Sequence, residues 1–128
     1  MTHPEGVVRV AAIGDLHCSK ASAGMLQPLF AQAAAAADVL VLCGDLTDYG
    51  LAEEAQILVK ELAIGAKVPT VAVLGNHDYE SGQQAEVQKI LIDAGIVLLD
   101  GESCELGGVG FAGVKGFAGG FGRGTLGA

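Results

Sequence analysis

The feature that most constrains the fold is a unit that occurs three times. An apolar segment ends at a single glycine, and side chains able to bind metal ions follow at once. The apolar segments span residues 7–13, 39–43 and 70–74, and they are rich in β-branched residues without polar alternation. This pattern indicates buried parallel strands covered on both faces. Helical patterns lie between them, so we predict an α/β fold with a parallel sheet.

The polar residues after the three glycines are expected to meet at one edge of this sheet. The glycines precede three short motifs: Asp15-Leu16-His17, Asp45-Leu46-Thr47-Asp48 and Asn76-His77-Asp78. The carboxyl ends of parallel strands point the same way, and ligands bind in the crevice beyond those ends. Three distant stretches should therefore deliver Asp, His and Asn side chains to one rim. Each glycine lacks a Cβ and so permits a sharp exit from the strand and a close backbone approach.

Three helices are predicted from the spacing of apolar residues. The first covers about 24–37 and starts or kinks near Pro28. The third covers about 82–94 and stops at Gly95. The second has an apolar stripe and a charged side, which we place largely on opposite faces. The stripe comprises Leu51, Ala55, Leu58, Val59 and Leu62, and the charged residues are Glu53, Glu54, Lys60 and Glu61.

After Gly95 the pattern changes. Residues 96–99 are a fourth strand candidate, and residues 103–106 and 109–114 flank Gly107-Gly108, a two-residue hairpin signal. From residue 115 to 128 glycine is too frequent for a regular element. Two interpretations of that segment stay open: a disordered terminus, or a loop truncated before its next strand.

Size and charge limit the classes of function. A chain of 128 residues with 51% hydrophobic and 17% charged residues is a single domain with a real core. No apolar run approaches the roughly 20 residues that cross a bilayer, and no basic leader precedes an apolar stretch. A net charge of −8 argues against nucleic acid held by a broad basic surface. A phosphate substrate remains compatible, because bound divalent ions reverse the local charge of a site.

Cysteine usage indicates a reducing compartment, and we expect the cytoplasm. The cysteines are Cys18, Cys43 and Cys104, an odd number without a disulfide pattern. We predict that Cys43 lies in a core strand, where a thiol behaves as a small hydrophobe. Cys18 directly follows the first motif, but no second thiol has the spacing of a metal site, so it is not expected to be a ligand.

The motifs carry the ligands of an oxygen and nitrogen metal site. Asp15 and His17 can bind the same ion, the two oxygens of Asp45 can bridge two ions, and Asn76 offers a neutral oxygen. This set suits Mn, Fe or Zn. Two such ions, about 3.5–4 Å apart, can hold the attacking oxygen and the leaving oxygen of an in-line displacement at phosphorus.

The remaining motif residues are given catalytic and supporting roles. In this hypothesis His77 carries no metal; it neutralises the phosphate and protonates the leaving oxygen as a general acid. Asp78 would orient His77, and Asp48 would similarly support His17.

The three motifs, in order and spacing, resemble the first three signatures of the calcineurin-like metallophosphoesterase superfamily. The resemblance implies that Asp15 and His17 bind the first metal, that Asp45 bridges, and that Asn76 binds the second. It implies that His77 contacts the phosphoryl group of the substrate. It also implies a two-sheet sandwich flanked by helices, and a metal-dependent hydrolase that acts on phosphomonoesters or phosphodiesters.

The sequence departs from the superfamily in its C-terminal half. Members carry further histidines there, including a Gly-His-x-His segment, whereas this sequence has no histidine after Asp78. We therefore expect residues 1–128 to be the N-terminal part of one metallophosphoesterase domain, an incomplete sandwich with a βαβαβ start. The chain alone is expected to bind metal weakly and to turn over slowly or not at all. Its uncovered sheet surface predicts self-association.

Other interpretations are possible. One is a catalytically silent scaffold that keeps the fold and works as an interaction protein, since fold does not secure activity. Another treats the polar residues as ordinary turn and cap residues, which suits one motif better than all three together. Residues 108–113 match G-x-G-x-x-G, but no helix pattern and no acidic partner follow, so we interpret them as part of a glycine-rich hairpin.

Overall fold

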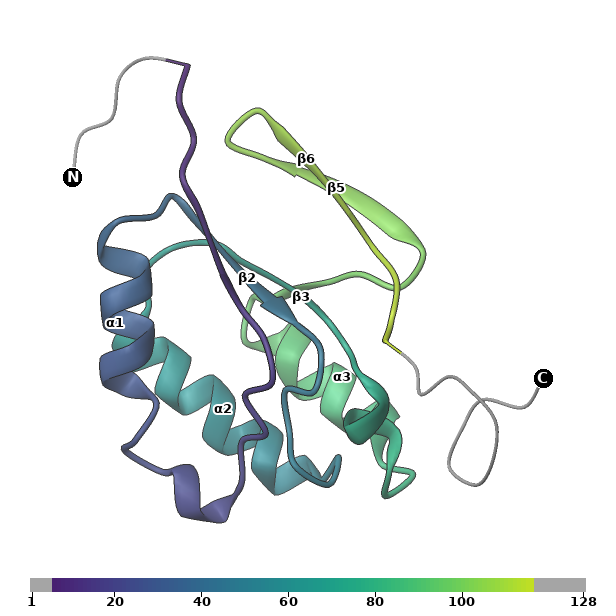
Figure 1. The fold of residues 1–128 in the computed structure, drawn as a ribbon. Coiled ribbons are helices and arrows are strands. Elements are labelled where there is room, and N and C mark those ends of the chain that lie inside the picture. Colours follow the sequence, from purple (N-terminus) through teal and green to yellow (C-terminus); the bar gives the residue numbers. More distant parts are fainter. Residues whose placement is uncertain (1–5, 117–128) are drawn as a thin grey trace.

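The computed structural model describes residues 6–116, and most of the glycine-rich segment predicted from residue 115 onward lies outside this range. At its centre is a parallel sheet of four strands that follow one another in chain order (Figure 1). The strands are β1 (Val10–Ile13), β2 (Val39–Cys43), β3 (Thr70–Val73) and β4 (Val97–Leu98). The predicted α/β class and parallel sheet are confirmed. The first strand is shorter than expected because its pairing with β2 begins at Val10.

A helix connects each strand to the next, and the helices lie together on one side of the sheet (Figure 1). They are α1 (Gln27–Ala35), α2 (Ala52–Gly65) and α3 (Gln84–Asp93), with short 3-10 turns at η1 (Lys20–Ser22) and η2 (Asn76–Tyr79). Pro28 lies in the first turn of α1, where its missing N–H costs no helical hydrogen bond. Gly95 ends α3 with a positive φ of 88°, as predicted.

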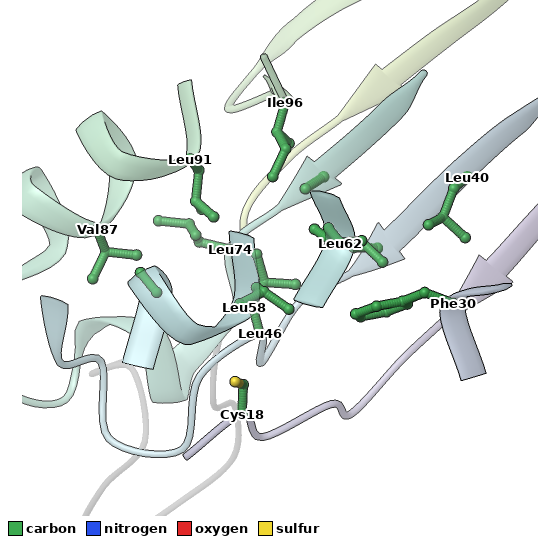
Figure 2. Close-up of a cluster of buried hydrophobic side chains, with 13 residues drawn as sticks. Cys18, Phe30, Leu40, Leu46, Leu58, Leu62, Leu74, Val87, Leu91 and Ile96 are labelled. Carbon is green, nitrogen blue, oxygen red and sulfur yellow. The ribbon is translucent and has the colours of Figure 1, made fainter. Parts of the chain in front are cut away.

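The main core fills the space between the sheet and these helices (Figure 2). Leu40 and Leu42 of β2 point into it and meet Phe30 of α1 and Leu58 of α2, all of them fully buried. Leu91 of α3 closes the far end of the same cluster. This packing sets the helices against the strands and so fixes the loops that leave the strand ends.

Two glutamates of α2 differ from the prediction. Glu54 and Glu61 were placed on the solvent side of the helix, but both are 2% exposed. Oε1 of Glu54 accepts hydrogen bonds from the backbone N–H groups of Tyr49 and Leu51, capping the start of α2. Glu61 accepts from the backbone N–H of Leu26 and from the side chain of Gln27, which fastens α1 to α2. Burial of these carboxylates is offset by hydrogen bonds that sequence spacing does not reveal.

The opposite face of the sheet is covered by the predicted hairpin, β5 (Glu102–Leu106) and β6 (Val109–Gly113), which turns at Gly107-Gly108. Val39 and Val71 are buried under it, packed against Leu106 and Phe111. A groove of about 290 Å³ lies between the sheet and β6. Cys43 lines this groove and is exposed, so the prediction of a core thiol was wrong. The second layer of the sandwich is therefore a single hairpin in the described residues.

Among residues 6–116, no helix combines the length and hydrophobicity that would let it cross a membrane.

Candidate metal centre

The polar motifs follow β1, β2 and β3 and gather at the carboxyl edge of the sheet, as predicted. The first two motifs run side by side beyond the strands. The backbone N–H of His17 donates to the carbonyl of Asp45 at 2.9 Å, and the N–H of Cys18 donates to the carbonyl of Leu46 at 2.9 Å. An isolated bridge between Cys18 and Thr47 continues this pairing. The parallel order of the sheet is thus extended into the loops that hold the candidate ligands.

Three motif residues have strained backbones. Asp15, His17 and Asp45 have φ values of 52°, 46° and 49°, and they are the non-glycine residues with positive φ among residues 6–116. An L-residue in this region costs about 1–3 kcal/mol and persists where the surrounding structure dictates it, often at functional sites. The strain falls on three of the four positions predicted to bind metal, and Asn76 is the exception.

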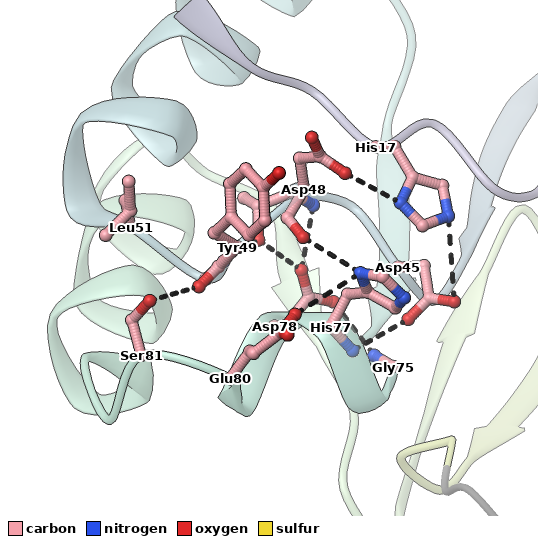
Figure 3. Close-up of polar contacts among 12 residues, drawn as sticks. His17, Asp45, Asp48, Tyr49, Leu51, Gly75, His77, Asp78, Glu80 and Ser81 are labelled. Atoms are coloured by element: carbon pink, nitrogen blue, oxygen red, sulfur yellow. Dashed lines mark hydrogen bonds and ion pairs between the residues drawn. The ribbon is translucent and has the colours of Figure 1, made fainter. Parts of the chain in front are cut away.

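The side chains of His17, Asp45 and His77 form a group that could hold a metal ion (Figure 3). Each offers one ligand atom, and these atoms all lie within 4.8 Å of one another. Nε2 of His17 is 3.9 Å from Oδ2 of Asp45. The imidazole rings of His17 and His77 meet edge to face, with centroids 4.5 Å apart. Side chains from three separate motifs therefore converge on one position.

Asp48 contacts both histidines on the side away from this position (Figure 3). Its Oδ1 is 3.3 Å from Nδ1 of His17, and its backbone carbonyl is 2.8 Å from Nδ1 of His77. Both partners are acceptors, so each histidine is expected to carry a proton on Nδ1. That tautomer leaves the Nε2 lone pair of each ring available to an ion. The predicted support of His17 by Asp48 is confirmed, and the sequence did not reveal the contact with His77.

The surroundings of His77 favour its protonated form. The hydrogen bond to the Asp48 carbonyl raises the pKa of His77 above its ordinary 6.5, burial opposes this, and the charges of Asp45, Glu80 and Asp48 add to the increase. Oε2 of Glu80 lies 3.5 Å from Nδ1 of the same ring. In the absence of metal, a cation on His77 is therefore stabilised by the carboxylates around it.

Asp78 differs from its predicted role. We expected it to orient His77, but its carboxylate is fully buried and hydrogen-bonded elsewhere. It accepts from the backbone N–H groups of Leu46, Thr47 and Gly75 and from the hydroxyl of Thr47. These bonds join the second motif to the third beneath the candidate site. The short distance between His77 and Asp78 in the sequence suggested a direct contact, whereas the Asp78 carboxylate is bonded to the backbone of Leu46, Thr47 and Gly75.

Asp15 and Asn76 lie at the exposed rim of the site. The side chain of Asp15 is 85% exposed, and its Oδ1 is 3.9 Å from Nε2 of His17. Asn76 begins η2 and is exposed. Neither belongs to the tight group of His17, Asp45 and His77. Their predicted roles as ligands remain predictions, which their position beside that group permits.

The donor set fits a divalent ion of the predicted kind. Imidazole nitrogens with a carboxylate oxygen suit Mn, Fe or Zn better than an ion that requires thiolates. Oδ1 of Asp45 already accepts from the backbone N–H of His77 at 3.0 Å, so Oδ2 is the oxygen free to face an ion. Cys18 is fully buried in the main core, and burial, together with the charge of Glu54, raises the pKa of its thiol to about 11. Its side chain thus stays protonated and away from the ligands.

Gly75 is the position where the close backbone approach predicted from the sequence is required. A Cβ built there would collide with the backbone nitrogen and Oδ1 of Asp45. Gly44 is needed for its positive φ of 83°, and Gly14 makes only an ordinary contact with Cys43. The three glycines of the repeated unit therefore serve different purposes, with Gly75 setting how closely Asp45 approaches the third motif.

Fold and site together define an α/β protein of the metallophosphoesterase type, with its polar loops at the carboxyl edge of a parallel sheet. The family described as calcineurin-like phosphoesterase matches residues 8–117, and the chain belongs to this family. The match includes all three motifs and confirms the resemblance found from the sequence. The comparison with curated proteins gave no match.

Proposed function

We propose that the protein is a metal-dependent phosphoric ester hydrolase that acts on a phosphomonoester or phosphodiester. The observation that carries this proposal is the convergence of His17, Asp45 and His77, whose ligand atoms lie within 4.8 Å of one another. Family membership supports the class of reaction. Strain at Asp15, His17 and Asp45 supports a site that the fold maintains for function rather than for stability.

We propose two divalent ions, Mn, Fe or Zn, as cofactors. Asp15, His17 and Asp45 would hold the first, and Asp45 with Asn76 would hold the second. Divalent ions at such a site supply Lewis acidity and neutralise charge on a phosphate. The protein has a net charge of −8, so it needs such neutralisation before an anionic ester can approach its carboxylate-rich rim.

The two histidines would be held ready for different tasks. Asp48 fixes the ring of His17 with Nε2 toward the Asp45 carboxylate, which suits a ligand. His77 is held through Nδ1, and its raised pKa suits a proton donor to the leaving oxygen. Its place in the cluster also suits a third ligand, and a variant can separate the two roles. Loss of a proton donor leaves metal bound, whereas loss of a ligand releases it.

The test combines metal titration with hydrolysis of p-nitrophenyl phosphate and bis-p-nitrophenyl phosphate. We expect Mn²⁺ to bind the wild-type chain, Asp45→Asn to lower its affinity at least about tenfold, and His77→Ala to leave metal bound with reduced turnover. Asp93→Ala, at an exposed position of α3, is the matched control. Equal Mn²⁺ affinity in the wild type and Asp45→Asn would contradict the bridging role of Asp45.

A second candidate is a catalytically silent scaffold of the same fold. The observation that favours it is that Asp15 and Asn76, two of the proposed ligands, lie outside the tight group of His17, Asp45 and His77. Metal binding without metal-dependent hydrolysis of either ester would favour the scaffold. Metal-dependent hydrolysis would exclude it.

We also propose a reducing setting, the cytoplasm. The cysteines at positions 18, 43 and 104 are free thiols, as expected where disulfides do not form.

A further inference from the structure

The segment that follows β6 returns to the candidate site. The backbone N–H of Gly116 donates to the carbonyl of Leu74 at 2.6 Å, just beyond the end of β3. A Cβ on Gly116 would lie 3.3 Å from the Cα of Gly75. Gly75 in turn lies against Asp45, so residues 114–116 form an outer layer next to the backbone of the site. Figure 1 shows this segment descending from β6 toward the turn at η2.

Lys115 in this segment contacts the aromatic ring of Tyr79, the last residue of η2. Its Nζ lies 4.6 Å from the centroid of the Tyr79 ring, within the range of a cation–π contact. Burial and the nearby charge of Asp100 raise the pKa of Tyr79, and its ring packs against the main core. The ring is therefore an uncharged, fixed platform for the ammonium group.

The contact with Tyr79 relates Lys115 to the residues of η2. Tyr79 and Asn76 are the last and first residues of η2. In a 3-10 turn, residues three apart lie one above the other on the same face. We infer from this spacing that Lys115 lies on the side of η2 that also presents Asn76, the proposed ligand of the second ion.

The charge of Lys115 differs from that of the groups around the site. Asp15, Asp45, Asp48 and Glu80 surround the two histidines with negative charge. Lys20 is paired with Glu53 at 2.9 Å, and Lys67 lies before β3, at the opposite edge of the sheet. Within residues 6–116, Lys115 forms no ion pair with a carboxylate. The ammonium group of Lys115 is thus available to bind an anion.

We propose that Lys115 is a substrate-binding residue whose ammonium group contacts a non-bridging oxygen of the phosphate ester, with Tyr79 as its positioning residue. This inference rests on the proposed function. A cation at this position would stabilise the bound phosphate directly, in addition to any divalent ions, and would favour a dianionic monoester over a diester.

The test uses inorganic phosphate as the probe and the full chain loaded with Mn²⁺. Phosphate and Mn²⁺ affinities are measured by calorimetry for the wild type, Lys115→Met, Lys115→Arg and Lys67→Met. Lys115 is exposed, so its variants keep the core intact. We expect Lys115→Met to weaken phosphate binding about tenfold, the effect of losing one charge-assisted hydrogen bond. Lys115→Arg should retain most of the affinity, and Lys67→Met should match the wild type.

A Tyr79→Leu variant tests the platform. We expect it to weaken phosphate binding less than Lys115→Met does, with the same Mn²⁺ affinity, and to have no further effect when combined with Lys115→Met. The inference is overturned if Lys115→Met binds phosphate within twofold of the wild type, or if Lys67→Met weakens binding equally. A wild-type chain that takes up no Mn²⁺ overturns the proposed function as well. If Mn²⁺ binds normally and Lys115→Met has the phosphate affinity of the wild type, the Lys115 proposal alone is overturned.

Discussion

At the scale of single residues, Asp48 determines much of the geometry of the candidate site. One residue provides two acceptors, a carboxylate for Nδ1 of His17 and a backbone carbonyl for Nδ1 of His77. A side-chain substitution therefore removes the first contact and keeps the second. This separation makes Asp48 a sensitive position for testing how far the orientation of His17 matters to metal binding.

We expect Asp48→Ala to lower Mn²⁺ affinity about 10- to 100-fold, the usual effect of losing the partner of a ligating histidine. The His77 contact survives because it uses the backbone. Competition with a metal-binding dye measures the affinity, and Asp93→Ala is the control on the surface of α3. Wild-type affinity in Asp48→Ala would mean that His17 needs no orientation by this carboxylate.

The pKa of His77 gives the metal-free protein a pH dependence. Because the pKa is raised in the folded state, protonated His77 stabilises the fold. This contribution is fully present below about pH 6.5, the ordinary pKa of histidine, and it is lost as the pH rises through the higher pKa of the folded protein.

Urea unfolding in EDTA at pH 6 and pH 8.5 checks this dependence. We expect the difference in the free energy of unfolding between the wild type and His77→Gln to become less favourable to the wild type as the pH rises, because glutamine carries no titrating proton. The remaining groups titrate in both proteins and cancel in the comparison. An advantage that grows between pH 6 and pH 8.5 would have the wrong sign and would contradict the raised pKa.

At the scale of elements, the repeated strand-glycine-ligand unit is built from parts with unequal demands. All three strands end alike, but Gly75 faces the backbone and carboxylate of Asp45, whereas a Cβ on Gly14 would make only an ordinary contact with Cys43. The unit therefore predicts the direction of the chain well. The repeated unit does not predict how closely the loop after each strand packs, because this packing depends on which motif lies next to that loop.

We expect Gly75→Ala to destabilise the fold by about 1–3 kcal/mol, the range for atoms forced into a packed region, and to displace Asp45 from the ligand cluster. Gly14→Ala should stay within about 0.5 kcal/mol of the wild type. Thermal unfolding and Mn²⁺ titration of both variants provide the comparison. Similar losses at the two positions would show that the close approach at Gly75 is not the limiting feature.

Local patterns in the sequence were sufficient for the strands, the order of the helices and the meeting of the motifs at one edge. Each of these follows from apolar periodicity, glycine positions and the direction of parallel strands. The burial of Glu54 and Glu61 was not predictable, because their partners come from loops that periodicity does not place. Asp78 was misjudged for the same reason. Its neighbour in sequence is His77, but its hydrogen-bond partners include Leu46 and Thr47 of another motif.

At the scale of the whole molecule, the two faces of the sheet are unequally covered. The helices bury one face, whereas the other is packed only by the hairpin within residues 6–116. Ala11 and Ile13 of β1 contact the helix-side core, so Val10 points to the hairpin side, where it is 46% exposed. Exposed apolar surface of this kind favours association between molecules. We propose that this face supports self-association.

We expect the apparent mass of the chain to rise with protein concentration and Val10→Lys to lower it, since a buried lysine at the contact would be costly. Light scattering coupled to gel filtration measures this effect. Ile92→Lys is the matched control, because Ile92 is 55% exposed on α3, on the helix side of the molecule. An apparent mass equal to that of the monomer at all concentrations would contradict the proposal.

The buried carboxylate of Asp78 has one more consequence, for the response of the fold to ions in solution. It joins residues 46–47 to residue 75 from inside the molecule, so the positions of Asp45 and His77 depend on this junction. An unfolded chain would then offer a divalent ion scattered ligands instead of a prepared pocket. Divalent ions in solution should for this reason increase the free energy of unfolding, and the increase should grow with their concentration.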